Sequence, residues 1–113
     1  MIEIASTPAI AGDTASAPSS VAKFRMIATT KHVALEHSNK NNQVYTLALG
    51  IISTGATFTS LTLTERKKEA MGNSMNVWGD SRELAGIGAS MVSEDFAFAI
   101  IKKIVIDEDT VML

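Results

Sequence analysis

The sequence predicts an α+β fold in which an antiparallel meander β-sheet is followed by two C-terminal helices packed on one of its faces. Two observations support this prediction. Apolar and polar residues alternate through much of residues 21–79, which is typical of half-buried strands, and the spacing of apolar residues becomes helical after Asp80. A run of strands followed by a run of helices is the order expected of an α+β domain.

The length of 113 residues is that of a single domain. Residues 1–20 are expected to form a weak N-terminal hairpin or arm, residues 21–79 the sheet, residues 80–106 the two helices and residues 107–113 a tail. The absence of cysteine excludes disulfides, zinc–thiolate sites and cysteine nucleophiles. The apolar runs are too short to span a bilayer, and the first residues lack the pattern of a signal peptide, so we expect no membrane partner.

The alternation begins at residue 21. Between residues 21 and 28, Lys23 and Arg25 separate apolar neighbours, which predicts a half-buried strand. The apolar set then changes face and continues with Val33 and Leu35, so a bulge or a new strand is expected between the two runs.

A hairpin is the next predicted unit. Residues 38–42 are polar and rich in asparagine, and they lie between two alternating runs, which is typical of a turn between antiparallel strands. The strand that follows is expected over residues 43–52. A second turn leads to a threonine-rich strand over residues 56–66, and a short strand is expected at residues 75–78.

Two helices are predicted after the sheet. Asp80 and Glu83 have the spacing of a capping box, which predicts the start of the first helix. The second is expected to begin near Ser93 and to include residues 96–106, which are apolar nearly all round. A helix this apolar is buried on several sides, which in a small protein indicates contact with a second copy. The residues expected at this homodimer interface are Met91, Phe96, Phe98, Ile100, Ile101 and Ile104.

The sequence contains no evident catalytic or metal-binding constellation. His32 and His37 are five residues apart, so on a strand they would point to opposite faces and could not share a metal. Gly86 and Gly88 lie in a predicted helix, without the strand and turn of a phosphate-binding loop; they would instead let another backbone approach closely. Residues 107–109 are expected to form a solvated acidic turn rather than a calcium site. We therefore expect no catalytic residue, metal or cofactor.

The hairpin over residues 32–49, HVALEHSNKNNQVYTLAL, resembles the alternating strand, polar turn and Tyr-Thr-containing strand of the coat proteins of single-stranded RNA bacteriophages. The order of elements over residues 21–106 is also similar to that family. The resemblance implies an interlocked dimer that assembles into an icosahedral capsid around single-stranded RNA. It also implies a location in the virion, after assembly in the cytoplasm of a bacterial host.

In that family the sheet faces the RNA, and the charge distribution agrees with this orientation. Residues 1–79 hold seven basic and five acidic residues, whereas residues 80–113 hold three basic and seven acidic ones. Hydroxyl and basic side chains contact phosphates and base edges. The candidate RNA-binding residues are Lys31, His32, Thr46, Thr62, Thr64, Arg66 and Lys68. The basic run 66–68 would equally serve to protect a strand end from edge pairing.

These expectations describe a structural coat protein and not an enzyme. The alternative is a small α+β oligomeric binding or phage tail-assembly module without a nucleic-acid role, and an enzyme of unknown type is the third hypothesis. Particle size separates the first two, because a coat protein expressed alone would elute as large particles that contain RNA.

Overall fold

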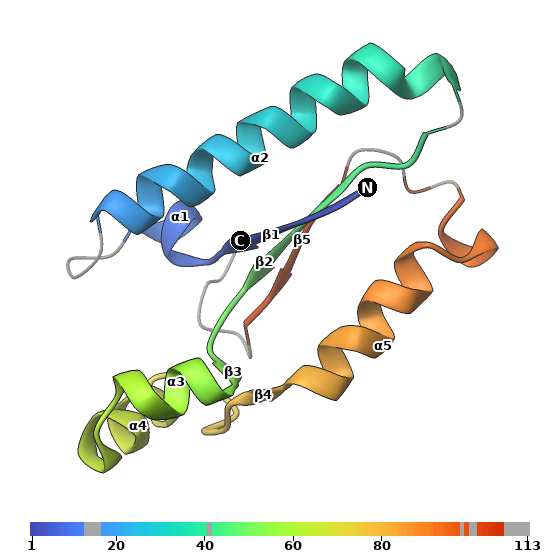
Figure 1. Cartoon of the computed structure of the whole chain (residues 1–113). Helices are drawn as coiled ribbons and strands as arrows, with labels where there is room; N and C mark the ends of the chain where they lie inside the picture. The colour runs from blue at the N-terminus through green and yellow to red at the C-terminus, as the bar shows by residue number, and fades with distance from the viewer. Residues whose placement is uncertain (13–16, 41, 98, 100–101, 108–113) are drawn as a thin grey trace.

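The computed structural model describes residues 1–12, 17–40, 42–97, 99 and 102–107, which form an α/β fold around a parallel sheet (Figure 1). The sheet has three strands in the order β1-β2-β5. They are β1 (Ile2–Ser6), β2 (Tyr45–Leu49) and β5 (Lys102–Ile106). β1 and β5 both run parallel to β2, with Ile2 and Lys102 on either side of Tyr45.

Helices cover both faces of this sheet (Figure 1). α2 (Ala17–His37) lies across one face, and α5 (Ser81–Met91) lies across the other, followed by the 3₁₀ turn η2 (Glu94–Phe96). The short helix α1 (Pro8–Ala11) joins β1 to the α2 side. No helix in the described part of the chain is long and apolar enough to cross a membrane.

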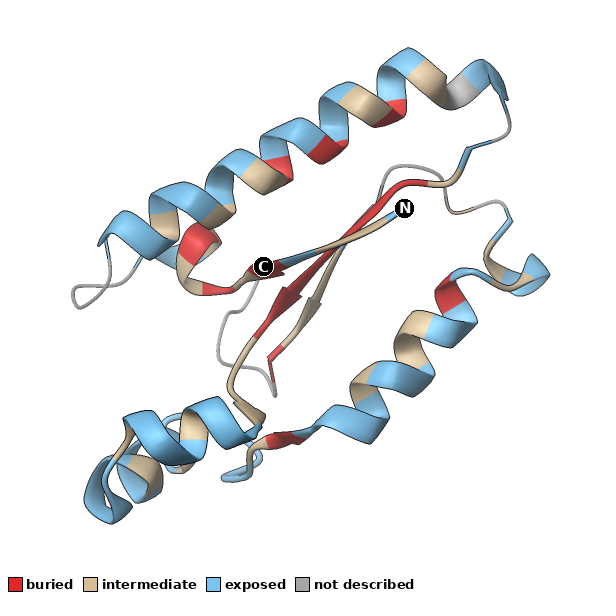
Figure 2. Ribbon diagram, viewed as in Figure 1, coloured by how far each residue is buried: buried red, intermediate tan, exposed pale blue. Residues whose placement is uncertain are grey.

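The core has two parts, one on each face of the sheet. On the α2 side, Ile27 packs with Ala5, Ala9 and Ala48. On the α5 side, the buried residues are Tyr45, Leu47, Leu49 and Met91. β2 contributes to both parts and is buried along its whole length (Figure 2). A strand covered on both faces is expected to be almost continuously apolar, which explains why Thr46 is its only polar residue.

A small lobe lies beyond the carboxyl end of β2 (Figure 1). β3 (Ile52–Ser53) pairs in parallel with β4 (Gly79–Asp80), and between them lie α3 (Gly55–Ser60) and α4 (Leu63–Ala70). Both helices begin with a capping box, formed by Thr54 with Thr57 and by Thr62 with Glu65. These boxes satisfy N–H groups that the first turn of a helix leaves unpaired. The predicted strand over residues 56–66 is therefore wrong, because its threonines cap helices.

The strands predicted between residues 21 and 36 are also wrong, because this segment lies within α2. The residues that α2 buries are Ile27, Thr30 and Ala34, whereas Phe24 and Leu35 are exposed. Because large apolar side chains of α2 point away from the sheet, the positions of apolar residues in the sequence do not follow the face of the helix that is buried.

At the C-terminal side, the first predicted helix is confirmed as α5, with Asp80 as its N-cap and the Glu83 carboxylate accepting from Asp80 N. The second is wrong: η2 and β5 occupy this region, while residues 98 and 100–101 lie outside the described residues. A short apolar run suits a buried strand as well as a helix. With a parallel sheet covered on both faces, the predicted α+β meander with interlocking helices is wrong.

Candidate functional site

The carboxyl ends of β1, β2 and β5 meet at one edge of the sheet. In open parallel sheets, ligands bind outside this edge. Here it is formed by Ser6 and Thr7 at the end of β1, by Gly50 after β2 and by Asp107 after β5. We call these four residues the carboxyl edge, and they are the candidate site.

Backbone hydrogen bonds hold the three strand ends in line. Thr7 N donates to Leu49 O at 2.9 Å, and Gly50 N donates to Ile106 O at 2.8 Å. The Thr7 hydroxyl also donates to Leu49 O, at 3.3 Å, so this buried side chain serves the packing of the edge. Gly50 presents only backbone at the end of the central strand.

Two serine hydroxyls at this end of the molecule make no hydrogen bond to the other described residues. Ser6 is half-buried at the end of β1. Ser20 Oγ is buried in the first turn of α2, the helix that covers this face of the sheet (Figure 1). Neither hydroxyl is therefore committed to a partner among the described residues, and Ser6 is the more accessible of the two.

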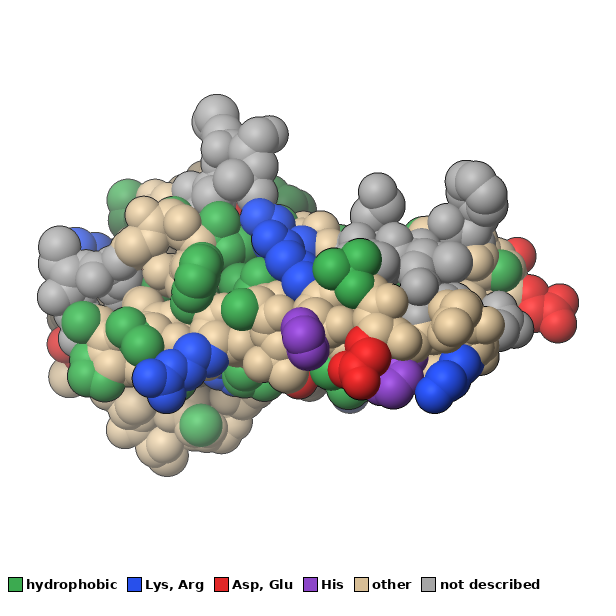
Figure 3. Space-filling model, turned by 90° about the horizontal axis from the view of Figure 1, so that it is seen from above, with side chains coloured by type: hydrophobic (Ala, Val, Ile, Leu, Met, Phe, Trp, Pro, Cys, Tyr) green, Lys and Arg blue, Asp and Glu red, His purple; other side chains and the backbone are tan. Residues whose placement is uncertain are grey.

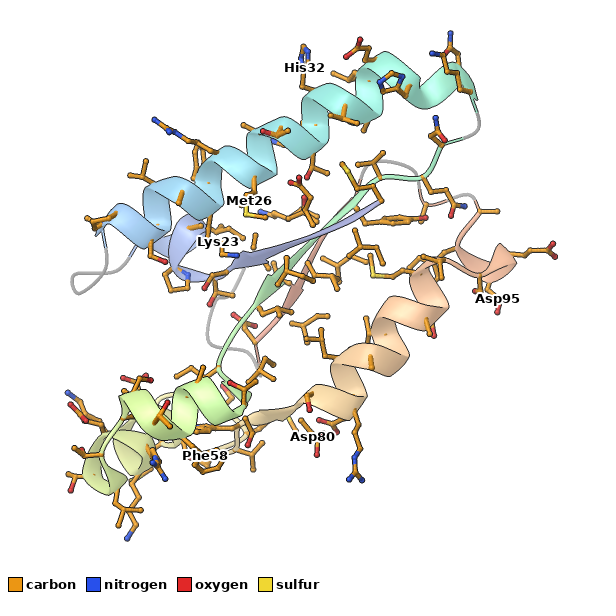
Figure 4. All side chains as sticks on the ribbon, in the orientation of Figure 1. Lys23, Met26, His32, Phe58, Asp80 and Asp95 are labelled. Carbon is orange, nitrogen blue, oxygen red and sulfur yellow. The ribbon has the colours of Figure 1, made fainter. Side chains whose placement is uncertain are left out.

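Lys23 brings a positive charge to the outer edge of β1. Its Nζ donates to Ile4 O at 2.8 Å, and Figure 4 shows the side chain reaching from α2 toward β1. β1 bonds to β2 through its odd-numbered residues, since Tyr45 N donates to Met1 O and Thr7 N to Leu49 O. The Ile4 carbonyl therefore points away from β2, two residues before Ser6.

This arrangement can bind an oxygen-bearing group. A serine hydroxyl both donates and accepts hydrogen bonds, and an ammonium stabilises negative charge that develops on an oxygen. Few side chains that could transfer a proton lie near the carboxyl edge. His32 points away from the sheet in Figure 4. The Tyr45 hydroxyl lies near the amino end of β2, where it donates to Phe96 O at 3.1 Å. No three His, Asp or Glu side chains of the described residues are placed to hold a metal ion.

The glycines do not form a phosphate-binding turn. Gly86 and Gly88 lie inside α5, as predicted, and a Cβ added at either would meet nothing within 4 Å. The close approach of another backbone, which the sequence suggested for them, is therefore not seen within the described chain. The segment after β1 contains one glycine, Gly12, with a φ of 86° at the end of α1.

The seven residues predicted to share an RNA-facing sheet surface lie on different elements. Lys31 and His32 lie on α2, Thr46 is buried in β2, and Thr62 is the N-cap of α4. The remaining three, Thr64, Arg66 and Lys68, lie on α4. The structure therefore provides no common face for them, and RNA contact by the individual residues stays a prediction.

Arg66 is already engaged within the lobe. Its Nε donates to Leu61 O at 3.0 Å, and its Nη2 donates to Phe58 O. The guanidinium carbon also lies 4.7 Å from the centre of the Phe58 ring. Two backbone carbonyls and an aromatic ring thus fix this side chain between α3 and α4.

Three of the six residues predicted at a homodimer interface belong to the core of a single chain. Met91 is fully buried beside Tyr45, while Phe96 and Ile104 pack against the same cluster. The rings of Phe96 and Tyr45 meet edge to face, with centroids 6.3 Å apart. Phe98, Ile100 and Ile101 lie outside the described residues, and self-association stays a prediction.

No protein-family description and no curated protein matches the sequence. Among solved structures, the chain is similar to a 4-hydroxyisoleucine dehydrogenase complexed with NADH, with a TM-score of 0.82 and 23% identity over 96% of this chain and 45% of that one. A complex with NADH and succinate gives 0.84 and 23% over 96% and 44%. A mutant complexed with NADH and succinate gives 0.88 and 22% over 96% and 45%. The chain thus has the Rossmann-like fold of these dehydrogenases and spans less than half of their length.

These findings correct the functional predictions. The likeness to RNA phage coat proteins is wrong, because it required an antiparallel sheet and the chain has the parallel sheet of a dehydrogenase. The capsid function, the virion location, the α+β binding module and the non-enzymatic role depended on the same fold and are wrong with it. The carboxyl edge was not predicted from the sequence. Two apolar runs, which end in Gly50 and Asp107, are typical of buried parallel strands and could have indicated it.

Proposed function

We propose that this chain forms part of an oxidoreductase that uses a nicotinamide dinucleotide. Its carboxyl edge would contact the nicotinamide end of the cofactor and an oxygen-bearing substrate. The observation that carries the proposal is the likeness of 96% of the chain to dehydrogenases complexed with NADH, at TM-scores of 0.82 to 0.88. The position of the edge agrees with the general location of ligands in open α/β sheets.

The described residues fit only one part of such a cofactor. In this fold, the pyrophosphate is bound by a glycine-rich turn between a strand and a helix. β1 is followed instead by Thr7 and Pro8, and the glycines of α5 are internal to a helix. The described residues therefore contain no turn that would bind the pyrophosphate.

Ser6 and Lys23 are the groups of this chain that suit a substrate oxygen. The Ser6 hydroxyl would donate a hydrogen bond to a carbonyl or accept one from an alcohol. The Lys23 ammonium, held by the Ile4 carbonyl, would favour negative charge on that oxygen. In this proposal both residues bind and orient.

The outer edge of β1 offers a place for the rest of the site. The backbone groups of Ile2, Ile4 and Ser6 point away from β2, and Ile4 is 40% exposed. A further parallel strand paired there would extend the sheet toward the second mononucleotide-binding half of a doubly wound fold. The proposal places the missing glycine-rich turn on that side.

The proposal is tested by titrating the isotopically labelled chain with NADH, with reduced nicotinamide mononucleotide and with AMP, while recording amide NMR spectra. NADH and the mononucleotide should shift the amide signals of Ser6, Thr7 and Gly50, and AMP should not. Ser6→Ala should weaken these shifts, whereas Ser60→Ala, an exposed serine on α3, should leave them unchanged.

Two outcomes would contradict the proposal. Shifts confined to the outer surfaces of α2 or α4 would place the ligand away from the carboxyl edge. Shifts produced by AMP as strongly as by the nicotinamide mononucleotide would show that the edge holds the adenosine end.

A further inference from the structure

The outward-facing side of α4 combines apolar and basic side chains. Leu63 is 73% exposed and Met71, the C-cap residue, is 75% exposed. Lys67 and Lys68 lie between them in the sequence and are exposed as well. We call these four residues the α4 flank. α4 lies at the outer end of the lobe, away from the three-stranded sheet (Figure 1), so the flank is presented at one end of the molecule.

The helical period places the α4 flank in one sector of the helix. With about 100° of rotation per residue, Leu63, Lys67 and Met71 follow one another in steps of about 40°. Lys68 lies about 60° beyond Met71, so the four side chains cover about 140° of the circumference. Helices that lie in a membrane interface present large apolar side chains together with lysine or arginine in this way.

The acidic residues of α4 lie on a different side of the helix. Glu65 and Glu69 stand two residues before and two residues after Lys67, so each is about 160° from it. Glu65 is also held by Thr62, whose backbone N–H and hydroxyl donate to its carboxylate at 2.8 and 2.7 Å. The α4 flank therefore carries positive charge without an acidic residue of α4 in its sector.

The outer side of α2 is another surface with exposed apolar side chains. Figure 3 looks down on this side and shows acidic and histidine side chains among the basic and hydrophobic ones. Glu36 is exposed there and lies 3.9 Å from His32. A negatively charged surface would repel Glu36, so the charge pattern favours α4 as the place where such a surface is bound.

We propose that the α4 flank is a docking surface for an anionic phospholipid membrane. Leu63 and Met71 enter the boundary between headgroups and acyl chains, and the ammonium groups of the two lysines attract the lipid phosphates. Lysine suits this position, because its apolar stem follows the neighbouring apolar side chains while its charge stays among the headgroups. A nucleic acid would use the lysines alone, so Leu63 and Met71 favour a lipid surface.

This contact differs from the spanning of a bilayer. The sequence predicted no membrane partner because its apolar runs are too short to cross one, and no helix of the described residues could do so. Contact with a membrane surface needs only apolar and basic side chains on one face of a helix. The α4 flank uses no residue of the carboxyl edge, so the inference stands independently of the proposed cofactor site.

The test is cosedimentation of the full chain with lipid vesicles. Vesicles of phosphatidylcholine and phosphatidylglycerol in equal parts should pellet the chain, and vesicles of phosphatidylcholine alone should pellet much less of it. Leu63→Gln with Met71→Gln should weaken binding to the mixed vesicles about tenfold or more. Val92→Gln, at a residue that is 65% exposed after α5, should bind like the wild type. Circular dichroism establishes that each variant is folded.

Removal of charge tests the electrostatic part of the contact. Lys67→Gln with Lys68→Gln should weaken binding to the mixed vesicles about 25-fold, since each lysine near an anionic surface contributes about fivefold. Lys31→Gln with Lys40→Gln removes two exposed positive charges elsewhere in the chain and should weaken binding far less.

Three results with vesicles would overturn the inference. They are a wild-type chain that does not pellet with the mixed vesicles, equal pelleting with the neutral vesicles, and glutamine variants of the α4 flank that bind like the wild type. Two further results would overturn it by assigning the flank to another partner. One is stronger binding of polyuridylate than of vesicles through the two lysines, and the other is self-association without vesicles that Leu63→Gln with Met71→Gln abolishes.

Discussion

Lys23 Nζ donates a hydrogen bond of 2.8 Å to the carbonyl oxygen of Ile4, on the side of β1 that faces away from β2. This contact joins the N-terminal half of α2 to β1, an edge strand of the sheet. Lysine side chains on sheet edges hinder pairing with other chains. While no further strand is paired with β1, the Lys23 ammonium occupies the Ile4 carbonyl and hinders pairing of this edge with unrelated chains.

Lys23→Met is expected to expose that edge. The free energy of unfolding should fall by about 0.5–1 kcal/mol, since one charge-assisted hydrogen bond in an exposed place is lost. Aggregation on mild heating should increase, because the β1 edge loses its charge. Urea unfolding and light scattering measure the two effects. Lys67→Met on α4 is the matched control and should change neither; equal aggregation of both variants would contradict the role of Lys23.

A pair of proline substitutions tests the hydrogen-bond direction of β1. The Ala5 N–H points to β2, so Ala5→Pro removes a bond of the ladder and should cost about 3 kcal/mol or more. The Ile4 N–H points outward, so Ile4→Pro should cost less than about 1 kcal/mol. Urea unfolding compares the two. A reversed order of stabilities would show that β1 pairs through its even-numbered residues.

Local signals in the sequence predicted part of this fold. The capping box of Asp80 and Glu83 was predicted because all its atoms come from four consecutive residues, and it is present at the start of α5. A strand was expected over residues 43–52, and β2 lies within this range. Its partners could not be found in the same way, because pairing with β1 and β5 joins residues more than forty positions apart.

Other elements were hidden by residue chemistry. α2 buries Thr30 and Ala34 but exposes Phe24 and Leu35, so its apolar period does not follow its core face. β5 consists of two lysines followed by a short apolar run, Ile104–Ile106, and such a run fits a helix or a strand equally well. The carboxyl edge depends on the parallel direction of all three strands, and this direction has no local signature in the sequence.

The Glu65 carboxylate should titrate below its ordinary value. The Thr62 hydroxyl and then the Thr62 backbone N–H donate to it, and both hydrogen bonds lower the pKa of Glu65. Because the pKa is lower in the folded chain, this contribution to stability is present above the ordinary glutamate pKa. It is lost as the pH falls through the lowered value.

The NMR signal of the Glu65 side chain, followed through an acid titration, measures this pKa. Thr62→Ala removes the hydroxyl donor and should raise the pKa toward the ordinary value. Thr64→Ala, two residues after Thr62 and outside the capping box, should leave it unchanged. A Glu65 pKa that does not respond to Thr62→Ala would mean that the capping box does not form in solution.

Arg66 is expected to stabilise the lobe of α3 and α4. Its guanidinium donates to the carbonyls of Phe58 and Leu61 and lies over the Phe58 ring. Arg66→Met should lower the stability of this lobe by about 1–2 kcal/mol, since two charge-assisted hydrogen bonds and a cation–π contact are lost. Hydrogen exchange of the α4 amides measures the local loss, which should exceed any change at the amides of β2.

Lys68→Met is the control, because Lys68 is an exposed basic residue of the same helix, and it should change α4 exchange by less than about 0.5 kcal/mol. Arg66→Lys separates charge from shape. Lysine keeps the charge, but its single ammonium cannot reproduce the planar fork that reaches both carbonyls. It should therefore recover only part of the stability. Full recovery with lysine would mean that Arg66 acts through charge alone, and unchanged exchange in Arg66→Met would mean that the two carbonyl contacts do not hold the lobe together.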